Sequence, residues 1–276
     1  MPTAYTSQQK SAIAQFISFT NTDRNMAIRH LKGQSWNVEA AANSFFSGGT
    51  GSGGSSASKS SLNKLFDKYR EDPTNSPDKV NADGSMKYLN DINADPECLE
   101  YIAVAEIIQA PTVAEMTREG FVDGWSALGC DTISKQKAHV ESLKRSLPTS
   151  LEAFTKIYKF TFGFAKPEGS KQVLLDFAIA YWELLFESPL SAVKWTLPNS
   201  PWSQWWAEFL RTSVKQSISK DVWTETLKFA QMTLNDESMS FWSEEASWPS
   251  VIDEFVDWVK KEKRPAEEVV DEEMEY

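Results

Sequence analysis

Side chains that could perform nucleophilic or metal chemistry are few and widely separated in this sequence. The two histidines, His30 and His139, lie on opposite sides of a Gly/Ser-rich segment, so they suggest no shared triad or metal site. Cys130, in "LGCDT", follows an apolar stretch, where a cysteine is usually a small buried hydrophobe. A phosphate-binding glycine loop and a Gly-x-Ser-x-Gly elbow are both missing. The residues therefore predict no catalytic group, no metal and no cofactor.

Two segments, "GSMKYLNDI" and "TREGFVDGWSALG", resemble the passage from an EF-hand loop into its second helix. With Gly84 as the loop glycine, Lys79 takes the first ligand position and Asn90 the place of the bidentate glutamate. With Gly120 as the loop glycine, Ser126 replaces that glutamate. Because calcium needs several anionic oxygens, the sequence predicts EF-hand-like units that bind no calcium.

The stretch "EEASWPSVIDEFVDWVKKEK" raises the question of charge recognition. From Ser250 onward it has helical spacing, with its apolar residues on one stripe. Asp253, Glu254 and Asp257 fall on the opposite face. Two interpretations are open at this point. Asp253 closes a capping box with Ser250, or it is exposed and presents its carboxylate to a basic partner.

Composition limits the class of protein. The chain has 276 residues, 41% of them hydrophobic, with 11 Trp and 16 Phe, which excludes a wholly disordered protein. We find no apolar run long enough for a membrane span, no signal segment and only two cysteines, so we expect an intracellular protein. The net charge of −11 argues against nucleic acid and favours basic protein surfaces as partners.

A flexible linker is predicted at residues 47–61, "SGGTGSGGSSASKSS", because this composition cannot bury apolar surface. It separates a small domain at residues 1–46 from a larger one at residues 62–263. The end, residues 264–276, carries six acids and one arginine and is predicted to be a solvated tail.

The small domain is predicted to contain three helices, the second and third capped by Asp23 and Asn37. This arrangement resembles the UBA (ubiquitin-associated) fold. The resemblance implies a weak ubiquitin-binding patch formed by Phe19, Phe45 and Phe46, although the usual Met-Gly-aromatic signature is missing. The alternative is a small bundle whose apolar residues form only its core.

Helical spacing continues through the larger domain with almost no strand signal. It contains, in order, "LGCDTI", "FTFGFAK", "AIAYWELL", "KDVWTETLKFAQM" and "EEASWPSVIDEFV". These motifs, after a UBA-like bundle and a linker, resemble the defective-in-cullin-neddylation family. The resemblance implies an all-α protein whose potentiating-neddylation domain has two calcium-free EF-hand-like units and C-terminal helices. It also implies a scaffold-type co-ligase, which forms no covalent intermediate. Such a protein binds a cullin together with the Nedd-specific conjugating enzyme.

The resemblance assigns two sites. The cullin-binding patch corresponds to Asp221, Ser247 and Asp253, where serine replaces the alanine that is usual at the middle position. The second site is an apolar groove for the acetylated N-terminal methionine of the conjugating enzyme. Its residues are Pro96, Tyr101, Val104, Ala105, Ile108, Val113, Ala114, Met116, Tyr181 and Leu184. The alternative for the groove residues is ordinary core packing.

Two other functions stay open. One is a ubiquitin-binding adaptor without ligase-promoting activity, and the other is an enzyme with an unrecognised carboxylate site. We expect localisation in the cytoplasm and the nucleus. The sequence assigns no role to the aromatic-rich segment "SPLSAVKWTLPNSPWSQWW", residues 188–206.

Overall fold

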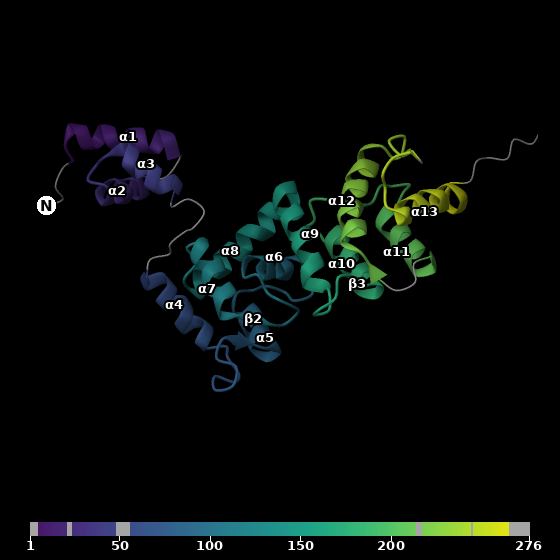
Figure 1. Cartoon of the computed structure of the whole chain (residues 1–276), viewed down its shortest axis with the longest axis horizontal. Coiled ribbons are helices and arrows are strands. Elements are labelled where there is room, and N and C mark those ends of the chain that lie inside the picture. The colour runs from purple at the N-terminus through teal and green to yellow at the C-terminus, as the bar shows by residue number, and fades with distance from the viewer. Residues whose placement is uncertain (1–4, 21–23, 48–55, 214–216, 244, 265–276) are drawn as a thin grey trace, which may run out of the picture.

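The computed structural model describes residues 5–20, 24–47, 56–213, 217–243 and 245–264. Within these ranges the chain is mostly helical, and its strands are two-residue segments that form two antiparallel pairs (Figure 1). The all-α fold predicted from the sequence is confirmed. None of the described helices is long and apolar enough to cross a membrane.

The first three helices form a bundle with a core of its own. α1 (Ser7–Thr20), α2 (Arg24–Gly33) and α3 (Val38–Ser47) each pack against the other two. The core residues are Ala12, Ile13, Phe16, Ala27, Leu31 and Ala41. Asn37 caps α3 as predicted, because its side-chain oxygen accepts a backbone N–H three residues later at 2.9 Å. Asp23, the predicted cap of α2, lies outside the described residues.

The larger domain contains the remaining elements. Its helices are α4 (Ser56–Asp67), α5 (Ala82–Asp91), α6 (Leu99–Ile107), α7 (Arg118–Ala127), α8 (Ile133–Ser146), α9 (Leu151–Ala165), α10 (Leu175–Glu187), α11 (Trp202–Ser213), α12 (Lys220–Asn235) and α13 (Ser250–Trp258). A 3-10 turn, η1 (Leu147–Thr149), precedes α9, and a π-helical turn, η2 (Val259–Lys263), extends α13. The strands are β1 (Lys79–Val80), β2 (Met116–Thr117), β3 (Val173–Leu174) and β4 (Ser217–Ile218).

Short antiparallel ladders join loops that lead from one helix into the next. In the first half of the domain β1 pairs with β2, with Val80 opposite Met116. In the second half β3 pairs with β4, with Val173 opposite Ile218. Each half of the domain therefore consists of two helix–loop–helix motifs joined by one ladder. This repeat agrees with the two EF-hand-like units predicted from the sequence.

The two glycines that we assigned to EF-hand loops are not loop residues. Gly84 lies in α5 and Gly120 in α7, each within the first turn of the helix. A Cβ atom at Gly84 would lie 2.0 Å from the carbonyl oxygen of Tyr69, and one at Gly120 would lie 2.1 Å from that of Ile108. These positions need glycine because the backbones of neighbouring segments approach closely, so the expected loop register is wrong.

The predicted linker is too long at its C-terminal end. Helix α4 begins at Ser56, so residues 56–61 are helical and belong to the larger domain. The helix packs against α7, and the Lys59 ammonium lies 2.8 Å from the Asp123 carboxylate. Ser58 is buried. Contacts with another helix thus override a composition that is typical of flexible chain.

Arg264, predicted to begin the solvated tail, is also part of the packed domain. Its guanidinium lies over the rings of Trp202 and Trp205, at 5.0 and 5.7 Å from their centroids. It also lies 3.1 Å from the carboxylate of Glu237. The rest of the predicted tail lies outside the described residues.

The aromatic-rich segment supplies the core of the second half of the domain. Trp195, Trp202 and Trp206 are buried there. The Trp195 indole N–H donates to the hydroxyl of Thr233 at 2.8 Å. A buried indole N–H needs such a partner, so this bond fixes the segment on α12.

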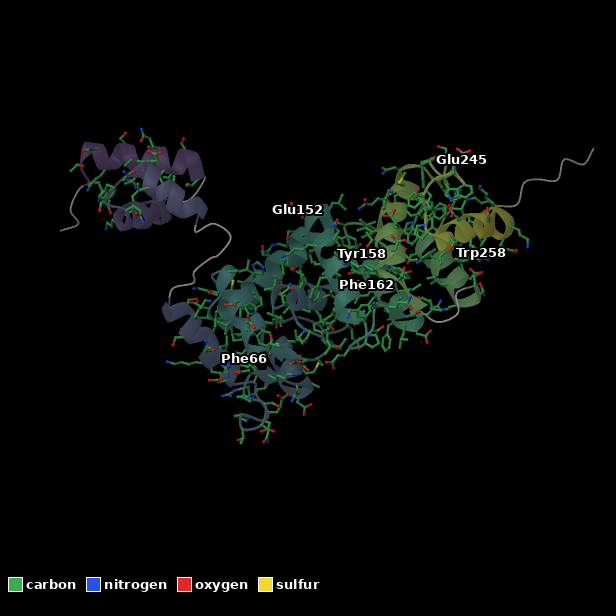
Figure 2. The ribbon with its side chains drawn as sticks, viewed as in Figure 1. Phe66, Glu152, Tyr158, Phe162, Glu245 and Trp258 are labelled. Atoms are coloured by element: carbon green, nitrogen blue, oxygen red, sulfur yellow. The ribbon has the colours of Figure 1, made fainter. Side chains whose placement is uncertain are left out.

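Tyr158 of α9 joins three helices in that core. Its hydroxyl donates to the carbonyl oxygen of Trp223 at 2.7 Å and accepts the indole N–H of Trp182 at 2.8 Å. The Trp182 and Trp223 rings stack, with centroids 4.8 Å apart. Figure 2 shows Tyr158 and Phe162 in the middle of the larger domain, between α9 and α12. These contacts position α12 against α9 and α10.

Candidate functional site: an apolar pocket and an acidic helix end

An apolar pocket beside α6 and β2 gathers six of the ten residues predicted for the groove. The six are Tyr101, Val104, Ala105, Ile108, Ala114 and Met116. The pocket, called the Tyr101 pocket below, is almost filled by its own lining and has a cavity volume of only about 10 Å³. Ser85, Leu89, Ala110 and Glu115 complete the lining. Sequence reasoning missed these four, although the spacing of Ser85 and Leu89 places them on one face of α5.

Two hydrogen bonds hold the wall of this pocket. The backbone N–H of Ala114 donates to the Tyr101 hydroxyl at 3.1 Å, and the Ser85 hydroxyl donates to the Ala114 carbonyl oxygen at 3.2 Å. Ala114 has a φ angle of 60°, in the left-handed region that a residue with a Cβ atom rarely adopts. The two bonds compensate for that strain and shape the loop before β2.

The other four predicted groove residues do not line the pocket. Tyr181 and Leu184 are half-buried on α10, Pro96 is half-buried, and Val113 is exposed. Tyr181 lies close to the pocket, because Phe164 contacts the rings of both Tyr101 and Tyr181 edge-to-face at 5.9 and 6.2 Å. The structure thus brings Tyr181 toward the predicted groove.

The core-packing alternative also holds for part of the pocket. Val104, Ala105, Ile108 and Met116 are each at most 3% exposed and belong to the main core. These residues therefore pack in the main core and also form the wall of the pocket. A substitution here changes stability as well as any binding.

The Tyr101 pocket is neutral as well as apolar. Burial raises the pKa of Tyr101, and it raises the pKa of Tyr181 to about 12, so both phenols stay protonated at physiological pH. The carboxylate of Glu115 in the lining is paired with the ammonium of Lys79 at 3.0 Å. Such a pocket favours an uncharged apolar group over a charged one.

Asp221 lies in the first turn of α12 and is exposed. The helix begins at a Ser219 cap, whose hydroxyl accepts the Val222 N–H at 3.2 Å. A carboxylate in a first turn is stabilised by the helix dipole, and here it remains open to solvent. Asp221 therefore presents an open carboxylate at the start of α12.

Asp253 is half-buried rather than exposed as predicted. One carboxylate oxygen, Oδ1, accepts the indole N–H of Trp242 at 2.9 Å. The capping-box alternative is wrong, because Pro249 is the N-cap of α13 and no side chain caps that helix. The carboxylate is instead held by the loop that precedes the helix.

Ser247 is exposed beside Trp248 in that loop. The Trp248 ring packs edge-to-face on Phe229 of α12 at 5.7 Å, and the Lys228 ammonium lies 4.5 Å from its centroid. These contacts attach the Ser247 segment to α12 about two turns after Asp221. The sequence did not predict that Trp242 would contact Asp253 or that Lys228 would contact Trp248. Both contacts involve the loop between α12 and α13, and a loop has no periodicity from which contacts can be predicted.

Cys130 and His139 of the larger domain are both packed against their surroundings. Cys130 is buried, and burial raises the pKa of its thiol, as expected for a small hydrophobe. His139 packs edge-to-face on Trp125 at 5.9 Å, and burial lowers its pKa. His30 has a side chain outside the described part of the chain. Within that part we find no group of three His, Cys, Asp or Glu residues that could hold a metal.

Phe19, Phe45 and Phe46, assigned to a ubiquitin-binding patch, lie in α1 and α3. Their side chains fall outside the described residues. The bundle itself has the three-helix arrangement predicted from the sequence.

The fold is that of a helical protein in which a three-helix, UBA-like bundle precedes a larger helical domain. Residues 10–52 match a family model described as "UBA-like domain", and residues 135–258 match one described as "Cullin binding". The second match contains α12, α13 and the loop between them, and hence all three residues of the predicted acidic patch.

Similar proteins place the chain in a family. Defective in cullin neddylation protein 1 of Pyricularia oryzae is 34% identical over 265 residues, covering 92% of this chain and 94% of the relative. The protein of the same name from Yarrowia lipolytica is 32% identical, covering 90% and 96%. Human DCN1-like protein 3 is 32% identical, covering 77% and 68%. The chain belongs to the defective-in-cullin-neddylation family.

Proposed function

We propose that this protein is a non-catalytic co-ligase for neddylation. It binds a cullin C-terminal domain and the Nedd-specific conjugating enzyme together, and so promotes transfer of the ubiquitin-like modifier onto a cullin lysine. Its place of action would be the cytoplasm and the nucleus. The observation that carries the proposal is the gathering of six predicted groove residues around one apolar pocket, in a chain of this family.

The Tyr101 pocket would take the acetylated N-terminal methionine of the conjugating enzyme. Acetylation removes the charge of the terminal amine, and a neutral apolar pocket penalises a buried, unpaired ammonium by several kcal/mol. The pocket has little free space, so entry of a methionine side chain requires a shift of its wall. The loop before β2, held by Tyr101 and Ser85, is the segment that would move.

Asp221, Ser247 and Asp253 would form the cullin contact. Two carboxylates near the starts of α12 and α13 suit a basic surface, and the small Ser247 side chain leaves room for close approach. Charge complementarity of this kind contributes to partner selection and to the association rate. We also propose that the first bundle binds ubiquitin, and this property is independent of the two sites in the larger domain.

The peptide arm of the test measures binding of acetylated and unacetylated N-terminal peptides of the conjugating enzyme. We expect the unacetylated peptide to bind about tenfold more weakly or worse, a difference of about 1.4 kcal/mol. Equal affinities would contradict the assignment of the pocket.

The functional arm is a reconstituted reaction with charged conjugating enzyme and a cullin C-terminal domain. Addition of the protein should raise the rate of cullin modification, and Asp221→Lys should abolish most of the increase. A protein that binds ubiquitin, yet leaves this rate unchanged, would be the adaptor instead. Glu152→Lys, an exposed carboxylate in the first turn of α9 and outside the patch, is the charge-matched control.

A further inference from the structure

The loop between α12 and α13 places one indole directly on Asp253. Trp242 donates its Nε1–H to Oδ1 at 2.9 Å, and this bond is partly buried. The Lys260 ammonium lies over the face of the same indole, 4.0 Å from the ring centroid. Among the described contacts none engages Oδ2 of Asp253, so one oxygen is held and the other is available.

The part of the loop that leads to Trp242, residues 236–242, is held by several hydrogen bonds. The Asp236 carboxylate accepts the backbone N–H groups of Ser238 and Ser240 at 3.1 and 2.8 Å. Hydrogen bonds from the hydroxyls and backbone of these serines lower its pKa to about 2. Met239 is buried, and its carbonyl oxygen accepts the Trp242 backbone N–H at 3.0 Å. Trp242 therefore starts from an ordered backbone.

We propose that Trp242 is a positioning residue that holds the Asp253 carboxylate for a basic side chain of the partner. The indole restrains the carboxylate through Oδ1 and leaves Oδ2 to accept from a lysine or arginine. Restraining a side chain before binding removes the entropy that the complex would otherwise lose. This inference rests on the proposed role of Asp253 in cullin binding.

Trp242→Phe is the direct test, because it removes the N–H donor and retains an aromatic ring for Lys260. Trp258→Phe is the matched control: Trp258 lies at the end of α13 (Figure 2), and the Lys263 ammonium lies 4.8 Å from its ring. No described hydrogen bond joins its indole to a carboxylate. Affinity for a cullin C-terminal domain is measured by calorimetry for the full chain and each variant.

We expect Trp242→Phe to weaken cullin binding about fivefold, the scale of one modest hydrogen bond, and Trp258→Phe to leave it unchanged. In an Asp253→Ala background, Trp242→Phe should have no further effect, because its effect passes through that carboxylate. An equal loss in both backgrounds would overturn the inference, since Trp242 would then act on its own. If Asp253→Ala binds cullin normally, the proposed role of Asp253 fails instead.

A spectroscopic measurement covers the case in which Trp242→Phe does not fold. The Trp242 indole N–H resonance of the native protein should shift in Asp253→Ala, and it should also shift when the cullin domain is added at saturation. The indole resonance of Trp258 should not change in either experiment. If the Trp242 resonance shifts neither in Asp253→Ala nor on addition of the cullin domain, the inference is contradicted.

Discussion

At the scale of single residues, the proposed acidic patch would combine two differently held carboxylates. Asp221 is exposed in a first helical turn, whereas Asp253 is half-buried and bonded to an indole. The first can attract a basic surface from a distance, and the second offers a restrained oxygen at close range. Both features follow from local structure around α12 and α13.

Charge reversal at Asp253 gives the first prediction. Asp253→Ala should cost about 1 kcal/mol of unfolding free energy, because the Trp242 hydrogen bond is lost. It should also weaken cullin binding, and Asp253→Lys should weaken it further by like-charge repulsion. Glu152→Lys, exposed in the first turn of α9, is the control. If that control loses as much affinity, the effect comes from net charge and not from the patch. Scanning calorimetry measures the change in unfolding free energy. Titration calorimetry at two salt concentrations measures the change in cullin affinity and how much of it salt screens.

The buried phenols give a prediction for alkaline pH. Burial raises the Tyr181 pKa from about 10 in the unfolded chain to about 12 in the folded protein. The folded state therefore holds this proton more tightly, and the stability that results is present below pH 10 and lost as pH rises toward 12. Tyr181→Phe should lose less stability between pH 9 and 11 than the native protein. Urea unfolding at these two values checks the difference, and identical losses would show that Tyr181 is not desolvated.

At the scale of elements, close backbone approach decides where α5 can lie. Gly84 is wedged against the Tyr69 carbonyl oxygen, whereas Gly163 in α9 has no atom within 4 Å of an added Cβ. Gly84→Ala should therefore destabilise the protein by about 1–3 kcal/mol or more. Gly163→Ala should stabilise it by about 0.5–1 kcal/mol, since alanine favours a helix. Thermal unfolding of the two variants measures whether each substitution raises or lowers stability. A change in the same direction for both would contradict the packing assigned to Gly84.

The same elements show what sequence reasoning could and could not predict. Helical spacing predicted the helices, and the cap at Asn37 was recognised from local chemistry. The register of the EF-hand-like loops was wrong, because glycine is required there by backbones distant in sequence. The indole on Asp253 was unpredictable for the same reason: only the folded loop from α12 to α13 brings Trp242 to it. The six groove residues that line one pocket were predicted from the family resemblance, because helical spacing alone does not single them out.

At the scale of the whole molecule, the chain consists of two separately packed cores joined through residues 48–55. The bundle core and the main core share no residues. Neither candidate site lies before Ser56. The larger domain should therefore carry the proposed co-ligase activity by itself, with the bundle contributing separately.

The last prediction concerns the true limits of that domain. A fragment of residues 56–264 includes the start of α4 and Arg264, whereas a fragment of residues 62–263 lacks both. The shorter fragment loses the Lys59–Asp123 pair and the stacking of Arg264 on Trp202. These losses should together cost about 1–2 kcal/mol, which lowers the Tm of a domain this size by about 4 °C.

Both fragments are compared with the full chain by calorimetry and in the reconstituted cullin reaction. The longer fragment should match the full chain in its rate of cullin modification. Because α4 packs on α7 and Arg264 on α11, the shorter fragment should differ in stability more than in activity at low temperature. Equal melting temperatures would mean that residues 56–61 and Arg264 contribute nothing to the domain. A longer fragment that folds but does not promote modification would assign a direct role to the first bundle.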